Sequence, residues 1–166
     1  LWQLVLRRVN QRSAQDNEFK WDLMDYLTGS GAPVGSLEEM IDMGVIHGAV
    51  EPVMRTWDAT ESRDSEDYQE RLQMRITLRE GIEQVMNRED IDVLVYPTAR
   101  QLPSRVGDPQ NNNNCRMSGH SGLPALSLPV GFTAAGLPIG MEVLGGMFED
   151  ARLVAIGYAF EQATHH

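Results

Sequence analysis

The chain has 166 residues but only one cysteine and one lysine, and both scarcities restrict its chemistry. A single cysteine, Cys115, cannot form an internal disulfide, which fits a reducing compartment and favours the cytoplasm, while a periplasmic or secreted location stays open. Lys20 lies between Glu18 and Asp22, whose negative charges favour the charged ammonium over the neutral amine that a general base needs. We therefore interpret Lys20 as a surface residue of a helix.

Positive charge, long apolar runs and ligand-binding motifs are also scarce. The net charge of −10 argues against nucleic acid and anionic membranes as partners. No apolar run approaches the ~20 residues of a membrane-spanning helix. The four histidines lack the spacing of a zinc site, and no glycine-rich loop followed by lysine is present to hold a phosphate. We expect neither a metal nor a cofactor.

The residues that are present predict a mainly helical front part, residues 1–90, because apolar side chains recur there at helical spacing. The expected helices are 1–12, Asn17 to Gly29 with Asn17 as its cap, Ser36 to Gly44 with a capping box at its start, and a long helix that follows Asp64-Ser65 and runs to about Asn87. The predicted buried side chains are Phe19, Leu23, Tyr26 and Leu27 on the second helix, and Tyr68, Leu72, Ile76, Ile82, Val85 and Met86 on the long one, with Arg71 outside that stripe.

Residues 91–166 predict an α/β part. Two apolar runs, Ala125–Phe132 and Leu137–Leu144, are joined by four residues that include a glycine, which is the pattern of a buried β-hairpin. Residues 92–96 follow a helix and are apolar throughout, which predicts a buried, parallel strand. Residues 149–162 predict a closing helix that is buried on much of its surface.

A long polar loop joins the strand at 92–96 to the hairpin. We interpret its run Asn111–Asn114 as a mobile tip rather than a recognition element. The stretch after it places Cys115, Ser118, His120 and Ser121 close together, which raises the alternative of a self-sufficient serine–histidine or cysteine hydrolase. The Gly-x-Ser-x-Gly elbow is missing and no neighbour is identifiable that would activate the thiol, so we favour structural roles for these residues.

Several short segments follow one another in a recognisable order along the back half. They are Asp92-Val93-Leu94-Val95-Tyr96-Pro97-Thr98, Gly107-Asp108-Pro109-Gln110, Asn114-Cys115-Arg116-Met117-Ser118, residues 122–132 and residues 136–145. In this order they resemble the C-terminal part of the amidase signature family of hydrolases. That resemblance implies a mixed, twisted sheet with helices on both faces. It also implies cleavage of amide bonds by a serine nucleophile, a second serine in a cis peptide and a lysine base.

The family's catalytic residues lie in a Gly/Ser-rich region upstream of the part matched here, and this chain has no such region. We therefore assign no catalytic residue to it. The resemblance instead implies part of the wall of a substrate pocket, with Thr98, Asn114, Cys115 and Ser118 as the expected contacts to a small-molecule amide. The expected partner is the N-terminal segment of the same amidase, and the chain alone is expected to be inactive.

The predicted fold class is thus α/β: the C-terminal part of a mixed-sheet α/β/α fold with a helical front half. Residues 1–90 and 91–166 are expected to form one segment of a larger single domain. The alternative function is a non-catalytic binding or scaffold module derived from the same fold. The sequence leaves open whether the chain forms a homodimer.

Overall fold

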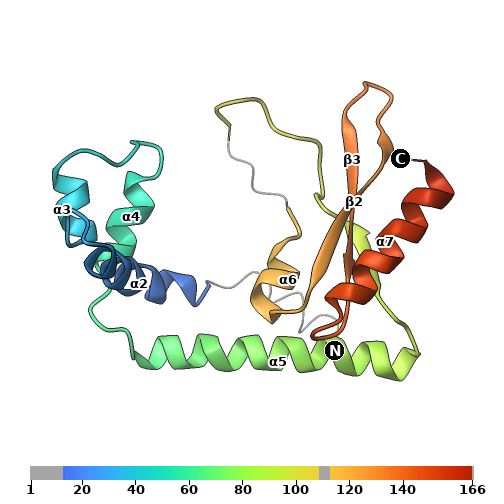
Figure 1. The fold of residues 1–166 in the computed structure, drawn as a ribbon, viewed down its shortest axis with the longest axis horizontal. Coiled ribbons are helices and arrows are strands. Elements are labelled where there is room, and N and C mark those ends of the chain that lie inside the picture. Colours follow the sequence, from blue (N-terminus) through green and yellow to red (C-terminus); the bar gives the residue numbers. More distant parts are fainter. Residues whose placement is uncertain (1–12, 109–112, 166) are drawn as a thin grey trace. The chain divides into compact units, whose positions relative to one another are not determined.

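A three-stranded antiparallel sheet lies at the centre of the C-terminal half in the computed structural model, which describes residues 13–108 and 113–165 (Figure 1). Strands β1 (Leu94–Pro97), β2 (Ala125–Phe132) and β3 (Pro138–Leu144) pair in the order β1-β3-β2. The predicted hairpin of β2 and β3 is confirmed. Its link closes where the Thr133 N–H donates to the Leu137 carbonyl over 2.8 Å.

Strand β1 differs from its prediction in direction and in burial. It pairs antiparallel with β3, with Leu94 opposite Leu144, and it is therefore not a parallel strand. It begins at Leu94 rather than at residue 92, and Val95 is 54% exposed. The reason is its place at an edge of the sheet, where only one side of the strand has a neighbour among the described residues. A preceding helix suggested a crossover connection, but strand pairing is decided by distant segments.

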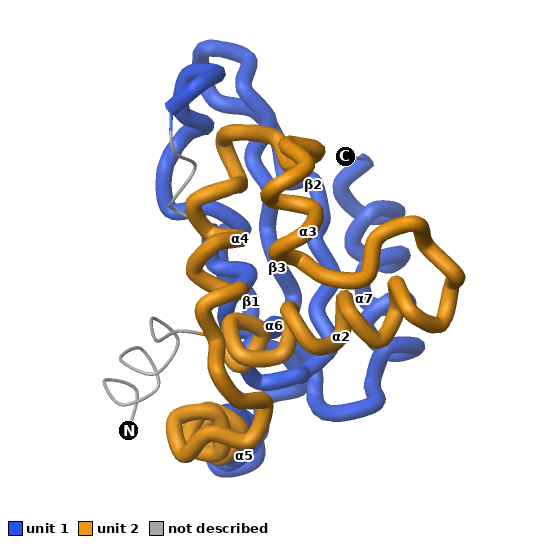
Figure 2. Tube along the Cα trace, turned by 90° about the vertical axis from the view of Figure 1, so that its left-hand side faces the viewer, with its two compact units in different colours: residues 1–10, 75–166 blue, residues 11–74 orange. Residues whose placement is uncertain are grey.

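The described chain divides into two compact units, residues 75–165 and residues 13–74, which Figure 2 colours separately. Helix α5 (Glu66–Glu89) contains the boundary between them. Its extent agrees with the predicted long helix. The helix predicted at residues 1–12, and residues 111 and 112 of the asparagine run predicted as a mobile tip, lie outside the described residues.

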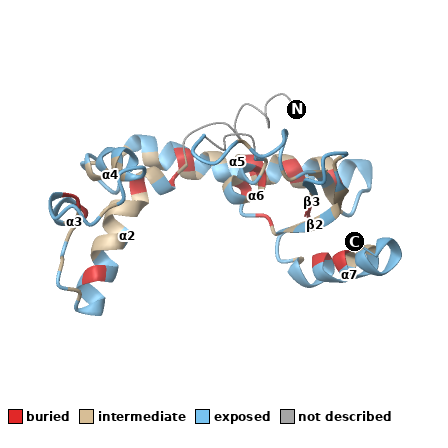
Figure 3. Cartoon of the chain, turned by 90° about the horizontal axis from the view of Figure 1, so that it is seen from above, coloured by how far each residue is buried: buried red, intermediate tan, exposed pale blue. Residues whose placement is uncertain are grey.

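The core of the first unit is built on α5. Leu78, Ile82 and Met86 recur every four residues on α5 and are buried with Leu144 of β3. This spacing places them on one face of the helix. Figure 3 shows buried residues along α5 and on the adjoining strands. Ile76 was predicted to belong to this stripe and is instead 38% exposed.

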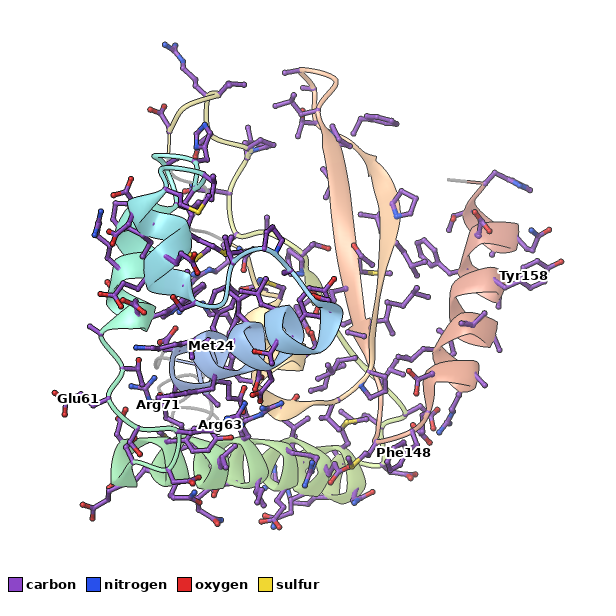
Figure 4. The ribbon with its side chains drawn as sticks, turned by 60° about the vertical axis from the view of Figure 1, so that its left-hand side comes forward. Met24, Glu61, Arg63, Arg71, Phe148 and Tyr158 are labelled. Carbon is purple, nitrogen blue, oxygen red and sulfur yellow. The ribbon has the colours of Figure 1, made fainter. Side chains whose placement is uncertain are left out.

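Helices α6 (Arg116–Ser121) and α7 (Asp150–Thr164) complete the first unit. A Cβ on Gly157 of α7 would lie 2.5 Å from Leu126 Cδ2, so glycine permits close packing of α7 on β2. The prediction that α7 is buried on much of its surface is wrong. Val154 is 62% and Tyr158 64% exposed, and Figure 4 shows Tyr158 projecting from α7 away from the strands.

The second unit contains α2 (Gln15–Ser30), α3 (Leu37–Asp42), α4 (Glu51–Asp58) and the start of α5. The predicted cap of α3 is confirmed, because Ser36 Oγ accepts the Glu39 N–H over 3.1 Å. Helix α4 was not predicted. It carries a proline in its first turn, where a missing N–H costs nothing.

Helix α2 differs from its prediction at both ends. Asn17 lies inside the first turn and is not the cap. The helix ends at Gly31, whose φ of 66° is left-handed, rather than at Gly29. Tyr26 is 70% exposed and does not join the buried face. Ala14 precedes the helix without a capping side chain, and the hydroxyl of Ser13 accepts the Gln15 N–H over 3.2 Å instead.

Lys20 is not the free surface residue predicted from the sequence. Its side chain is 22% exposed, and its ammonium lies 3.3 Å from Asp58 Oδ1 and donates to the Asp58 carbonyl over 2.5 Å. Among the described residues, no helix has the length and apolar composition that crossing a membrane requires.

Candidate functional site

A row of polar side chains crosses the middle of the apolar sheet. Tyr96 of β1 and Ser127 of β2 each lie opposite Glu142 of β3. Residues directly opposite in antiparallel strands share a face, so these three side chains lie on the same side of the sheet. Just beyond β1, Thr98 continues the row, since its Oγ1 lies 3.1 Å from Ser127 Oγ. The sheet therefore presents two adjacent polar pairs.

The first pair joins Tyr96 and Glu142. Glu142 is only 5% exposed, and Tyr96 Oη donates to its Oε1 over 2.7 Å. Burial raises the pKa of Tyr96 above its ordinary value, and the hydrogen bond to the Glu142 carboxylate raises it further. Tyr96 therefore stays protonated at neutral pH and serves as a fixed donor to the buried carboxylate.

The second pair depends on a glycine. The Thr98 N–H donates to the Gly140 carbonyl over 3.0 Å, which brings Thr98 against β3. A Cβ on Gly140 would lie 2.9 Å from Thr98 Oγ1 and 3.3 Å from Thr98 Cβ. Only glycine therefore lets the Thr98 hydroxyl reach Ser127 in this geometry.

The segment that leads into α6 lies beside Thr98. Asn114 N–H donates to the Thr98 carbonyl over 2.9 Å, and Asn114 Nδ2 donates to the Pro97 carbonyl over 2.7 Å. The Cys115 thiol donates to Asn113 Oδ1 over 2.8 Å. The structure thus brings together three residues predicted from the sequence, namely Thr98, Asn114 and Cys115.

The serines of α6 are engaged with their own helix. Ser118 Oγ donates to the Cys115 carbonyl over 3.1 Å, and Ser121 Oγ donates to the Met117 carbonyl over 2.7 Å. Ser121 is 1% exposed. This arrangement supports the structural roles favoured for these serines over a serine–histidine pair, because a nucleophile must be accessible and bonded to its base.

A hollow of about 750 Å³ opens beside this polar row. Its polar lining comes from Thr98, Arg100, Gln101, Asn113, Ser127 and Thr133. Its apolar lining comes from the loop after β1 and from the strands of the hairpin, and includes Leu102, Leu128 and Ile139. Thr98 is the predicted contact residue that lines the hollow; Asn114, Cys115 and Ser118 lie on the adjoining segment. A cavity with an apolar wall and a few polar groups suits a small organic ligand.

Sequence reasoning missed Tyr96, Ser127 and Glu142 as members of the site. A signal for Glu142 was present, since it is the one charged residue in the apolar run from Leu137 to Leu144. A charged side chain in a buried strand requires a partner, and that requirement points to a donor on a neighbouring strand. Within the part of the chain that the structure describes, no group of three or more His, Cys, Asp or Glu residues could hold a metal ion.

Comparisons with known proteins agree with one another. A family model described as Amidase matches residues 18–154. The chain is similar to one of the subunits of glutamyl-tRNA(Gln) amidotransferase from Oceanobacillus iheyensis, with 28% identity over 107 residues, which are 60% of this chain and 22% of that protein. The corresponding protein of Ralstonia pickettii is 52% identical over 48 residues, which are 28% of this chain and 10% of that protein.

The fold is similar to that of the native peptide amidase from Stenotrophomonas maltophilia. The two superpose with a TM-score of 0.78 at 25% identity, over 92% of this chain and 33% of the peptide amidase. The chain therefore spans about a fifth of the length of the Oceanobacillus relative and about a third of this structural neighbour.

Proposed function

Because the chain belongs to the Amidase family, we propose that it is the C-terminal segment of an enzyme that hydrolyses a carboxylic amide. The resemblance and the α/β fold class predicted from the sequence are confirmed by the family match and by the structural neighbours. In this proposal the serine nucleophile, the cis serine and the lysine base belong to a segment that precedes these residues.

The main support for this proposal is the family match over residues 18–154. The one lysine of the chain, Lys20, is not available as the catalytic base. Lys20 forms an ion pair with Asp58 in the second unit. A lysine base must be neutral and must contact its serine, and an ammonium held by a carboxylate meets neither condition. This contact supports assigning the catalytic groups to another segment.

The substrate contacts in this proposal are Thr98, Asn114, Cys115 and Ser118. Thr98 lines the hollow beside Ser127, and Asn114 and Cys115 are held next to it by hydrogen bonds. Hydroxyl and amide groups beside an apolar wall suit a neutral carboxamide with an apolar acyl group. No step in binding requires a metal or a charged cofactor.

The proposed partner, the N-terminal segment, has a place to pair. Within the described residues, β1 and β2 each have one strand neighbour, β3, so the outer side of each is unpaired. Unpaired strand edges bind further strands through main-chain hydrogen bonds. An edge of this kind supports association with a segment that extends the sheet.

Intact-mass analysis of the protein isolated from its source tests the proposal. The expected result is either a longer polypeptide or a stable second polypeptide that contains a Ser–Ser–Lys site. Isolation of these 166 residues from the source with neither a longer polypeptide nor a second one would contradict it. An isolated assembly that lacks the Ser–Ser–Lys site and binds amides without turnover would favour the alternative of a non-catalytic binding module.

A further inference from the structure

A second hollow, of about 550 Å³, lies within the second unit among α2, α4 and the start of α5. Asp16 is the residue that joins these elements. Its Oδ1 accepts the Trp57 indole N–H over 3.1 Å, its Oδ2 lies 3.3 Å from Arg71 Nη1, and its carbonyl accepts the Thr60 hydroxyl over 3.3 Å. These bonds hold the three elements around a common polar space.

Asn17 lines this hollow with an incomplete set of hydrogen bonds. The residue is 7% exposed, and its Nδ2 donates to Ser65 Oγ over 3.3 Å. Its buried Oδ1 accepts no hydrogen bond from the described part of the chain. A buried amide oxygen without a donor destabilises the fold, and native proteins satisfy such groups with water or a ligand. The site therefore lacks one N–H or O–H donor.

The charge of the residues around the hollow indicates which kind of ligand could supply the donor to Asn17 Oδ1. The residues that line the hollow include three acidic ones, Asp16, Glu61 and Asp67, and one basic one, Arg71. Arg71 is 9% exposed and is held by Asp16 and by Asp67, with a distance of 2.6 Å to Asp67 Oδ2. Figure 4 shows Arg71 and Glu61 in the second unit. An excess of negative charge in a recess favours a cation.

We propose that this hollow binds a primary alkylammonium group, whose N–H donates to Asn17 Oδ1 and whose charge is balanced by the acidic lining. An ammonium supplies three donors, and Trp57 adds an aromatic side chain to the wall. The site is separate from the hollow beside Thr98, and it stands whether or not the chain belongs to an amide hydrolase.

Titration of the ¹⁵N-labelled 166-residue chain with n-butylammonium chloride tests this site. The reporter is the indole N–H resonance of Trp57, assigned by its loss in Trp57→Phe, because that N–H donates to Asp16 in the hollow. We expect a saturable shift of this resonance. Asn17→Leu, which removes the acceptor, is expected to weaken binding roughly tenfold. Asn17→Asp keeps an acceptor and adds charge, so it is expected to bind at least as tightly as Asn17.

Asn87→Leu is the matched control, since Asn87 is exposed on α5 outside this hollow, and its affinity should equal that of the unchanged chain. Sodium butyrate and n-butanol, at the same ionic strength, test the choice of ligand. Equal shifts with either compound would overturn the proposal. Unchanged affinity in a folded Asn17→Leu would also overturn it, and a folded chain with no saturable shift would assign Oδ1 to water alone.

Discussion

Tyr96 and Glu142 lie opposite one another on β1 and β3, and the phenol donates to the carboxylate over 2.7 Å. A carboxylate that is 5% exposed thus has its hydrogen bond from an edge strand. The pair ties β1 to the central strand of the sheet, and it adjoins the Thr98 and Ser127 hydroxyls that line the hollow.

Removal of the Tyr96 hydroxyl should destabilise the chain. Tyr96→Phe leaves the buried Glu142 carboxylate without this donor, and we expect the free energy of unfolding to fall by about 1–3 kcal/mol at neutral pH. Denaturation in urea, followed by circular dichroism, measures the change. Tyr26→Phe is the control, because Tyr26 is 70% exposed. An equal effect of the two substitutions would contradict the assigned role.

Alkaline pH should weaken the fold through the same residue. The pKa of Tyr96 is raised above its ordinary value of 10.0, so the folded state keeps this proton where the unfolded chain loses it. The contribution of Tyr96 to stability is therefore complete below about pH 10 and declines as the pH rises above it. Urea denaturation from about pH 9 to about pH 11 should show this decline, and it should be smaller in Tyr96→Phe.

Gly140 should not tolerate a side chain. Gly140→Ala forces a methyl group to within 2.9 Å of Thr98 Oγ1, and we expect a loss of about 1–3 kcal/mol in the free energy of unfolding. Adding Thr98→Ala should recover part of this loss, since the nearest atom is removed. Gly119→Ala in α6 meets no atom within 4 Å and should be neutral or stabilising. Thermal denaturation of the unchanged chain and of these three variants measures the differences.

Arg71 should be the critical arginine of the second unit. Its guanidinium is 9% exposed and contacts Asp16, Asp67 and the Ser13 carbonyl. Arg71→Met leaves these acceptors without their cation, and we expect a loss of about 1–3 kcal/mol. Arg63→Met removes the solvent-exposed pairs to Asp22 and Asp25 and should change stability little. Comparable losses in the two variants would argue against this distinction.

The sequence predicted the elements whose signals are local. Glycine and proline bounded the two runs of the hairpin, and Ser36 with Glu39 marked the start of α3. The long apolar stripe predicted helix α5 and the burial of Ile82 and Met86 on it. These features depend on a few neighbouring residues, so a single sequence contains them.

The features that the sequence did not predict depend on distant partners. The direction of β1 is set by its pairing with β3, which lies nearly fifty residues further along the chain. Tyr96 of β1, for example, lies opposite Glu142 of β3. Arg71 was placed outside the apolar stripe, and it is buried because Asp16 and the Ser13 carbonyl approach it from α2 and from the residues before it. Of the site, Thr98, Asn114 and Cys115 were predicted, while Ser127 and Glu142 were not, since only strand register aligns them.

Substrate binding should depend on the Thr98 hydroxyl. In the assembled enzyme, Thr98→Val keeps the shape of the side chain and removes the hydroxyl that lines the hollow. We expect KM for a carboxamide to rise roughly fivefold, with kcat nearly unchanged. Thr164→Val at the end of α7, where the hydroxyl donates to the Phe160 carbonyl, is the control. A fall in kcat with constant KM would contradict a binding role.

Ammonia release from a primary carboxamide shows whether hydrolysis requires residues outside this chain. The assay compares the 166-residue chain alone with the same chain assembled with a segment that carries a Ser–Ser–Lys site. We predict hydrolysis only in the assembly, with its loss when the lysine of that segment is replaced and its retention in Lys20→Ala. Hydrolysis by the chain alone at the rate of the assembly, abolished by Ser118→Ala or Ser121→Ala, would contradict the account.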